Sequence, residues 1–256
     1  MWQDIKLLNA TANFLFGVCI CALLLSGIWV LAHRPVFSLK VIEVDGQEQG
    51  SLKHVNAEII RSTALPLIKG NFFTTNLDLV RHSFELVPWV RKASVRREWP
   101  DKLIVTIEEH SPLGIWGDGG QLLSIKGDVF TANLAEAEED TKLLEFSGPA
   151  GSEKEVLMHY LEFKDWFKPI ALAPESVAYS NRYAWMVKMN SGLVVKLGRE
   201  ENSSVLKERV SRLLRVYPEL INRLQGKIES VDLRYANGLA LKASGQELNV
   251  VVKTKK

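Results

Sequence analysis

Residues 89–109, WVRKASVRREWPDKLIVTIEE, decide the fold of the first globular part of the chain. Two strand-like runs flank the segment Trp99-Pro100-Asp101-Lys102, in which proline and aspartate favour a tight turn. In the second run Leu103, Val105 and Ile107 alternate with residues of the opposite face, so one face is fully apolar. The stretch therefore predicts a β-hairpin that packs one face on a core.

The first strand of this hairpin is basic, and three interpretations compete for it. Its cationic residues are Arg91, Lys92, Arg96 and Arg97. A nucleic-acid site is disfavoured because 30 acidic residues nearly cancel 32 basic ones, and because only Trp89 and Trp99 supply aromatic rings. The strand is then either a charged edge that discourages stray pairing or an edge that recruits a partner strand.

The residues before the hairpin predict a strand and two helices. A strand near residues 37–44 ends at Asp45-Gly46. Asn56 begins a first helix, and Thr75 or Asn76 begins a second. In the second helix the apolar residues recur at helical spacing, at Leu77, Val80, Phe84 and Val87. The order strand, helix, helix, strand, strand predicts a two-layer α/β unit over residues 36–110.

The chain begins with a long uncharged segment, residues 7–32. As a helix it reaches about 39 Å, against about 30 Å for the hydrocarbon core of a bilayer. A cleavable signal peptide and a buried soluble helix are the alternatives. Both are disfavoured, because the apolar run exceeds a signal core and is too long for an ordinary core helix. The flanking charges leave the orientation in the membrane open.

A second unit is expected over residues 111–245, with a tail at 246–256. Short apolar runs separated by glycine-rich turns predict a mostly β domain with two helices, one ending near Phe167 and one beginning near Ser204. The acidic stretch at 135–140 is expected to be a solvated loop. Residues 228–234 and 239–242 are expected to close the unit as strands. The fold class is therefore α+β, with a single N-terminal transmembrane helix.

Residue clusters typical of catalysis are scarce in this sequence. The only cysteines, Cys19 and Cys21, lie in the apolar run. Phosphate-binding loops and nucleophile motifs are absent, and the histidines are scattered. The densest titratable cluster, Glu108-Glu109-His110, is interpreted as a solvated strand end because adjacent strand residues face opposite sides. We expect no catalytic residues, no metal site, no cofactor and no nucleic-acid partner.

Two stretches carry a resemblance to a known family. GNFFTTNLDLVRHSFELVPWVRKASVRREWPDKLIVTIEEHSPLGIW, residues 70–116, is similar to the POTRA segment of the FtsQ family of bacterial cell-division proteins, called DivIB in other bacteria. SVDLRYANGLAL, residues 230–241, is similar to the closing strands of that family. A short end at 1–6, a transmembrane helix at 7–32, a POTRA domain at 36–110 and an FtsQ-type β domain at 111–245 follow the family plan.

The resemblance implies a non-enzymatic scaffold of the divisome. It implies a single-pass protein of the inner membrane at the division septum, with a cytoplasmic N-terminus and periplasmic domains. Its implied partners are FtsB and FtsL, and its implied role is to link early and late assembly and to regulate septal peptidoglycan synthesis. Other division proteins are implied as partners of the POTRA domain and of the membrane helix.

In the family, FtsB adds a strand at the end of the second domain. Mapped onto this sequence, the implied partner-binding residues are Tyr235, Ala236, Asn237, Gly238, Leu239, Ala240 and Leu241. Tyr235 suits an anchor because it is large, with few rotors and a polar tip. The alternative is that Tyr235 packs in its own domain beside a plain hairpin turn. A possible second partner edge comprises Arg91, Ser94, Arg96 and Arg97.

Two rival functions follow from the same architecture: a membrane-anchored periplasmic enzyme and a POTRA-type outer-membrane assembly factor. An enzyme requires a cluster of acids, metal ligands or an activated nucleophile, which the sequence does not show. Assembly factors of that kind repeat the POTRA unit and end in a barrel, whereas this chain has one such unit and no long series of lipid-facing strands.

Overall fold

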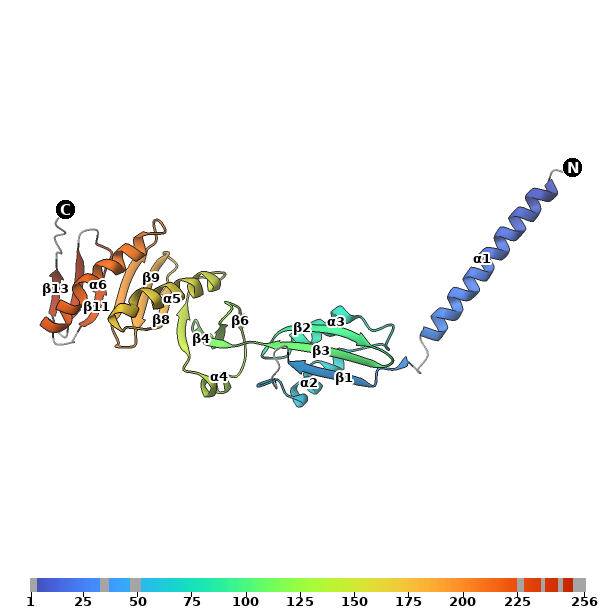
Figure 1. Cartoon of the computed structure of the whole chain (residues 1–256), viewed down its shortest axis with the longest axis horizontal. Coiled ribbons are helices and arrows are strands. Elements are labelled where there is room, and N and C mark those ends of the chain that lie inside the picture. Colours follow the sequence, from blue (N-terminus) through green and yellow to red (C-terminus); the bar gives the residue numbers. More distant parts are fainter. Residues whose placement is uncertain are drawn as a thin grey trace. The chain divides into compact units, whose positions relative to one another are not determined.

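A computed structural model describes residues 4–32, 37–46, 52–224, 228–235, 238–243 and 246–250. The chain divides into two compact units, residues 1–109 and 110–256 (Figure 1). The first unit contains the N-terminal helix and the small α/β domain, and the second contains a large sheet with its helices. Two residues of the expected partner site, Ala236 and Asn237, lie outside the described residues.

Helix α1, Asp4–Ala32, contains the segment predicted to cross a membrane. Its portion Leu8–Val30 has a mean hydropathy of 2.2 and is long and apolar enough to do so. Its side chains are exposed on every face from 8 to 30, so the helix has no apolar stripe turned toward a protein core. Such a helix suits lipid on all sides, as expected of a single-pass membrane protein.

The α/β domain has the predicted order of elements. These are β1 (Val41–Gly46), α2 (Ala57–Thr63), the 3₁₀ turn η2 (Leu65–Leu67), α3 (Leu77–Glu85), β2 (Val90–Glu98) and β3 (Lys102–Glu109). The side chains of Asn56 and Asn76 accept hydrogen bonds from the first backbone amides of α2 and α3. These caps satisfy amides that a helix leaves unpaired, which fixes where each helix begins.

The three-stranded sheet of this domain has the order β1-β3-β2. β3 pairs in parallel with β1 and antiparallel with β2. The apolar strand therefore lies in the middle and the basic strand at an edge, which confirms the prediction for the hairpin. Leu103, Val105 and Ile107 are buried on one face, and Phe84 of α3 is buried in the same domain. The helices thus cover one face of the sheet (Figure 1).

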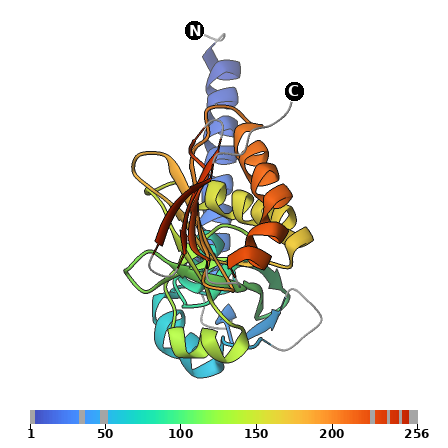
Figure 2. The same cartoon turned by 90° about the vertical axis from the view of Figure 1, so that its left-hand side faces the viewer.

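The second unit is built on a ten-stranded sheet of order β13-β12-β11-β10-β9-β8-β7-β4-β5-β6. Its elements are β4 (Pro112–Trp116), β5 (Gln121–Ser124), β6 (Val129–Phe130), α4 (Leu134–Asp140), β7 (Leu144–Ser147), α5 (Glu153–Phe167), η3 (Lys168–Ile170), β8 (Pro174–Tyr179), β9 (Ala184–Met189), β10 (Val194–Arg199), α6 (Val205–Leu224), β11 (Ile228–Asp232), β12 (Leu239–Ala243) and β13 (Gln246–Val250). Figure 2 shows α5 and α6 on one face of this sheet.

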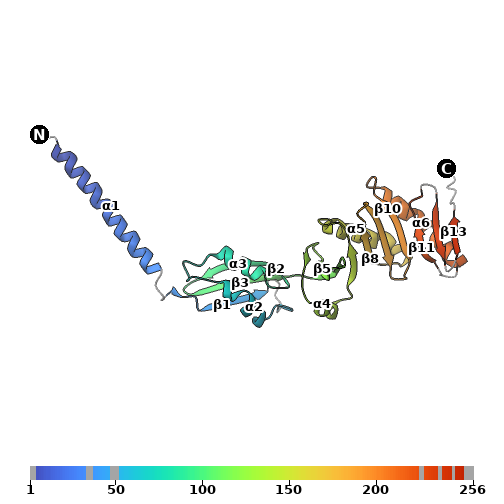
Figure 3. The same cartoon turned by 180° about the vertical axis from the view of Figure 1, so that it is seen from behind.

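The core of the second unit lies between these two helices and the central strands. Phe163 and Phe167 of α5, Leu213 of α6 and Trp185 of β9 are almost fully buried in one cluster. Helix α6 continues through Pro218. The same cluster includes Val231 of β11 and Leu239 and Leu241 of β12, so the core reaches the C-terminal strands, beside which α6 lies (Figure 3).

Two sequence expectations for this unit are wrong. The expected acidic loop at 135–140 belongs to α4, because Asn133 caps the first turn and Ala137 is fully buried. The second unit therefore has three α-helices rather than two. The expected tail at 246–256 begins with a strand, because 246–250 pair antiparallel with β12 along its whole length.

Gly114 supplies a test of the sheet. A Cβ at this position would lie 2.2 Å from the carbonyl oxygen of Leu144, its partner on β7, so the two backbones must separate to admit a side chain. We expect Gly114→Ala to lower the free energy of unfolding by roughly 1–3 kcal/mol, the usual cost of overpacking. Gly119→Ala is the matched control, because nothing lies within 4 Å of its added Cβ. Thermal unfolding followed by circular dichroism measures both, and equal midpoints would contradict the described register.

Candidate functional site

The margins of the two sheets are the surfaces on which another polypeptide can pair. An edge strand presents a row of N–H and C=O groups that have no neighbour within the sheet, and a partner strand can bind them through its backbone alone. In the described residues these margins are β13 and β6 of the large sheet, and β1 and β2 of the α/β domain. The predicted partner-binding residues lie at the β13 end and on β2.

The strand predicted to be the open C-terminal margin, β12, is paired on both sides. β11 lies on one side and β13 on the other, with Leu239 opposite Val250 and Leu241 opposite Leu248. Leu239 and Leu241 are also only 3% and 2% exposed. The prediction that these two leucines lie on an open edge is therefore wrong. Both leucines belong to the core cluster of the second unit, and residues 246–250 continue the sheet by one more strand.

Tyr235 lies just after β11, at the turn that leads to β12. Its side chain is 57% exposed, so it does not pack inside its own domain. This exposure is what the partner-anchor interpretation requires, and it argues against the alternative in which Tyr235 fills a core position. Gly238, on the far side of the same turn, is buried, and Ala240 on β12 is half-buried.

Arg212 of α6 fixes the two described ends of this turn. Its Nη1 donates hydrogen bonds to the backbone carbonyl oxygens of Tyr235 and Gly238, the latter at 3.0 Å. Burial, followed by the positive charges of Arg209 and Arg215, lowers the pKa of Arg212. The guanidinium links helix to turn, so Tyr235 is presented from a position that the core of the domain determines.

An ion pair lies immediately before Tyr235. Arg234 donates from Nε to both carboxylate oxygens of Asp232, at 2.9 and 3.0 Å, and its backbone N–H donates to the same carboxylate. Burial of Asp232 raises its pKa, but these hydrogen bonds outweigh that effect and hold the pKa below its ordinary value. The pair therefore stabilises the end of β11 at neutral pH and weakens only in acid.

The basic edge of the α/β domain is partly used by the domain itself. Arg91 forms an ion pair with Glu108 at 3.1 Å, and Arg97 donates to the carbonyl oxygens of Phe72 and Thr75 at 2.7 and 2.6 Å. Ser94 and Arg96 are exposed on the same strand. Of the four residues predicted for a second partner edge, two therefore support their own fold and two face solvent.

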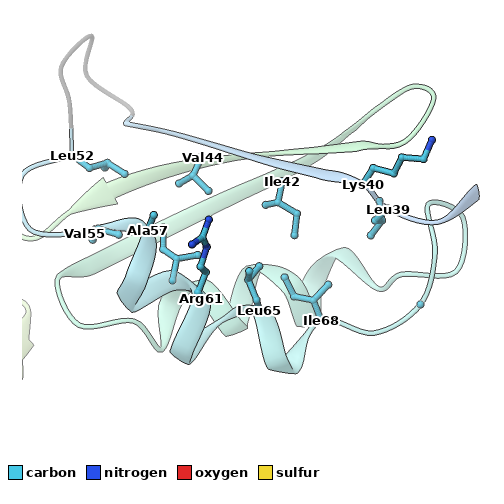
Figure 4. Close-up of a pocket in the computed structure, with 12 residues that line it drawn as sticks. Leu39, Lys40, Ile42, Val44, Leu52, Val55, Ala57, Arg61, Leu65 and Ile68 are labelled. Atoms are coloured by element: carbon cyan, nitrogen blue, oxygen red, sulfur yellow. The ribbon is translucent and has the colours of Figure 1, made fainter.

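The opposite edge of that domain has a groove that sequence reasoning did not find. It encloses about 660 Å³ between β1 and the helices α2 and η2. Figure 4 shows Ile42 and Val44 on the strand facing Leu65 and Ile68 below them, with Arg61 among them. Alternate side chains of β1 are only half-buried, so the apolar layer of the domain is open along this edge. Periodicity predicts which face is apolar, but it does not reveal that a helix fails to cover it.

The densest titratable cluster in the sequence has structural partners. Glu108 pairs with Arg91, while Glu109 accepts hydrogen bonds from the backbone amides of residues 53, 54 and 55 at 2.7 to 3.0 Å. His110 stacks on Phe130 with ring centroids 4.0 Å apart. Among the described residues, no group of three or more His, Cys, Asp or Glu side chains is arranged to hold a metal ion.

Comparison with known proteins matches both units to family models. Residues 37–110 match the model described as POTRA domain, FtsQ-type, and residues 114–234 match the model described as Cell division protein FtsQ/DivIB, C-terminal. These matches span the α/β domain and the large sheet as far as the end of β11.

Curated relatives match over almost the whole chain. A protein of Burkholderia pseudomallei named Cell division protein FtsQ is 46% identical over 245 residues, which cover 96% of this chain and 95% of that protein. Proteins of the same name from Bordetella pertussis and Nitrosospira multiformis are 36% and 34% identical, and the matches cover 94% and 95% of this chain and 92% and 100% of theirs.

Arg212 provides a test of how the turn is held. Arg212→Met removes two hydrogen bonds to the turn while keeping an unbranched apolar stem, so amide exchange at Gly238 and in β12 should accelerate. Arg215→Met on the same helix is the control, because Arg215 is exposed. Hydrogen-exchange mass spectrometry measures both variants, and equal exchange in the two would show that Arg212 does not hold the turn.

The Asp232–Arg234 pair provides a pH test. Because the folded pKa of Asp232 is depressed, its stabilisation is present above the unfolded pKa and is lost as the pH falls through the folded value. Asp232→Asn should therefore lower the unfolding midpoint at neutral pH, and the difference from the unmodified chain should shrink below about pH 4, the ordinary range of aspartate. If the difference in unfolding midpoint between the variant and the unmodified chain does not change with pH, the ion pair is not its cause.

Proposed function

This chain belongs to the FtsQ/DivIB family of cell-division proteins, and we propose that it acts as a non-enzymatic scaffold of the divisome. In this proposal it binds FtsB together with FtsL and helps to link early and late assembly with the regulation of septal peptidoglycan synthesis. The observation that carries the proposal is the exposed Tyr235, fixed by Arg212 beside the last hairpin of the sheet.

We propose that the partner contributes a strand that pairs with β12 in the place that β13 occupies. The position of Tyr235 supports this arrangement. Tyr235 adjoins the start of β12, whereas the outer edge of β13 lies one strand further away, about 4.8 Å more. A partner strand next to β12 therefore passes within reach of the tyrosine ring.

The exchange of one strand for another is energetically plausible at this margin. β13 is the last strand of the sheet and pairs with β12 alone, through five residue pairs from Leu239–Val250 to Ala243–Gln246. An incoming strand replaces the same backbone hydrogen bonds, so the exchange leaves few amides unpaired. The side chains of the partner strand and of β13, and the contacts that each strand makes with Tyr235, then decide which of the two pairs with β12.

The proposed topology places residues 1–6 in the cytoplasm and both folded domains in the periplasm, at the septum. The cysteine usage is compatible with this location, because the chain has no cysteine after Cys21 and so cannot form wrong disulfides in an oxidising compartment. The exposed Ser94 and Arg96 on β2, and the membrane helix itself, are the proposed contacts for other division proteins.

Tyr235→Ala tests the anchor. Loss of a buried aromatic anchor at an interface typically costs on the order of 2 kcal/mol or more, which corresponds to at least about a 30-fold weaker affinity. Tyr183→Ala is the matched control, since Tyr183 is 64% exposed at the turn before β9, away from the margin. Titration of the full chain in nanodiscs with the FtsB–FtsL periplasmic segments measures both. Equal affinities of the two variants would remove Tyr235 from the interface.

Deletion of residues 244–256 tests the exchange of strands. Without β13, the partner no longer competes with an internal strand, so binding of the FtsB–FtsL segments should be retained or become tighter. The same titration measures this, with circular dichroism as the check that the sheet remains folded. A folded variant that no longer binds would show that the partner pairs with β13 itself.

A further inference from the structure

One end of the α/β domain presents large aromatic side chains to solvent. Trp99, at the turn between β2 and β3, is 75% exposed, and Phe73 is 48% exposed. Exposed rings of this size carry apolar surface that a soluble domain normally buries, so together they indicate a contact surface.

Hydrogen bonds bring three separate segments to this end of the domain. The N–H of Lys40 donates to the carbonyl oxygen of Asp101 at 3.1 Å, and the N–H of Phe72 donates to that of Phe37 at 2.8 Å. The rings of Phe37 and Phe73 meet edge to face, with centroids 4.9 Å apart. We call the group formed by residues 37–40, 69–74 and 97–102 the tether end. Figure 4 shows Lys40 there, at the start of β1.

The chain length between the membrane helix and the tether end is short. Helix α1 ends at Ala32, and Phe37 is already part of the domain. Five residues reach at most about 17 Å when fully extended. The headgroup layer outside the hydrocarbon core is itself about 5–8 Å deep. The tether end is therefore confined to the immediate vicinity of the bilayer surface, and the β2–β3 turn lies at that same end.

The charges at the tether end suit a phospholipid surface. Lys40, Lys69, Arg97 and Lys102 are basic, against the acidic Glu98 and Asp101. Lys40 pairs with Asp101 at 3.0 Å, yet its side chain remains 65% exposed. A net positive end with protruding tryptophan and phenylalanine matches the composition of interfacial anchors, in which rings enter the headgroup region and cations meet phosphates.

We propose that the tether end docks on the bilayer, with Trp99 and Phe73 in the headgroup region and the lysines at positions 40, 69 and 102 at anionic phosphates. The membrane helix then supplies only the first of two attachments, and the second fixes which end of the domain faces lipid. This contact goes beyond the proposed scaffold function, because it needs no division partner and does not depend on which side of the membrane carries the domains.

A fluorophore that reports lipid contact tests the proposal in the full chain. Cys19 and Cys21 are replaced by serine, and single cysteines are introduced by Trp99→Cys, Phe73→Cys and, as control, Ser94→Cys on the same strand as the turn. Each protein carries an NBD label and is reconstituted in vesicles of phosphatidylcholine and phosphatidylglycerol containing headgroup-proximal spin-labelled lipid. Position 94 is exposed but lies several residues along β2 from the tether end.

The proposal predicts that lipid-borne quencher reduces the fluorescence at positions 99 and 73 at least several-fold more than at position 94. It also predicts that Trp99→Ser in the Phe73→Cys protein lowers quenching at position 73. In vesicles without phosphatidylglycerol, the quenching at position 99 should exceed that at position 94 by a smaller factor. Equal quenching at positions 99 and 94 would overturn the proposal. Because the quencher is attached to lipid, contact of Trp99 with another protein gives this same negative result.

Discussion

Backbone hydrogen bonding on the two sides of β12 is the interaction on which this account of the molecule depends. One side is satisfied by β11, which the central core holds through β10 and α6. The other side is satisfied by β13, the last strand of the sheet. A strand on that second side pairs amides and carbonyls of β12 that would otherwise be left to water, so either β13 or an incoming strand can stabilise the margin. The proposed function is that a partner strand replaces β13 at this side of β12.

The rest of the second unit holds this margin in place. Helices α5 and α6 pack on the central strands, and Arg212 extends that rigid core to the turn that carries Tyr235. The Asp232–Arg234 pair fixes the residues just before the turn. In the proposed strand addition, affinity for the partner comes from backbone pairing, and selectivity comes from a side chain held in a defined position.

The sequence predicted those parts of the fold that local patterns determine. The asparagine caps at 56 and 76, the apolar alternation of β3 and its place in the middle of the small sheet were all foreseen. The acidic composition of residues 135–140 is typical of a solvated loop and hides helix α4, although Asn133 gives an N-cap signal. Two alternating apolar residues, Leu248 and Val250, are too short a pattern to predict strand β13. Alternation also shows which residues share a face, but not whether a strand has a second neighbour.

For the candidate site, the role of the turn at Tyr235 stays a prediction, while the predicted open edge at its two leucines is wrong. Tyr235 is exposed as expected, while Leu239 and Leu241 are in the core. Arg212 could not have been found, because it reaches the turn from a helix more than twenty residues earlier and only the folded chain brings them together. The exposure of Trp99 likewise depends on the folded domain, and its place in a turn does not predict it.

The most direct measurement of the central claim is amide hydrogen exchange of the full chain with and without the FtsB–FtsL segments. If the partner strand takes the place of β13, the amides of residues 246–250 exchange faster in the complex while those of β12 stay protected. Slower exchange in both strands of the hairpin would contradict the account and would place the partner on the outer edge of β13.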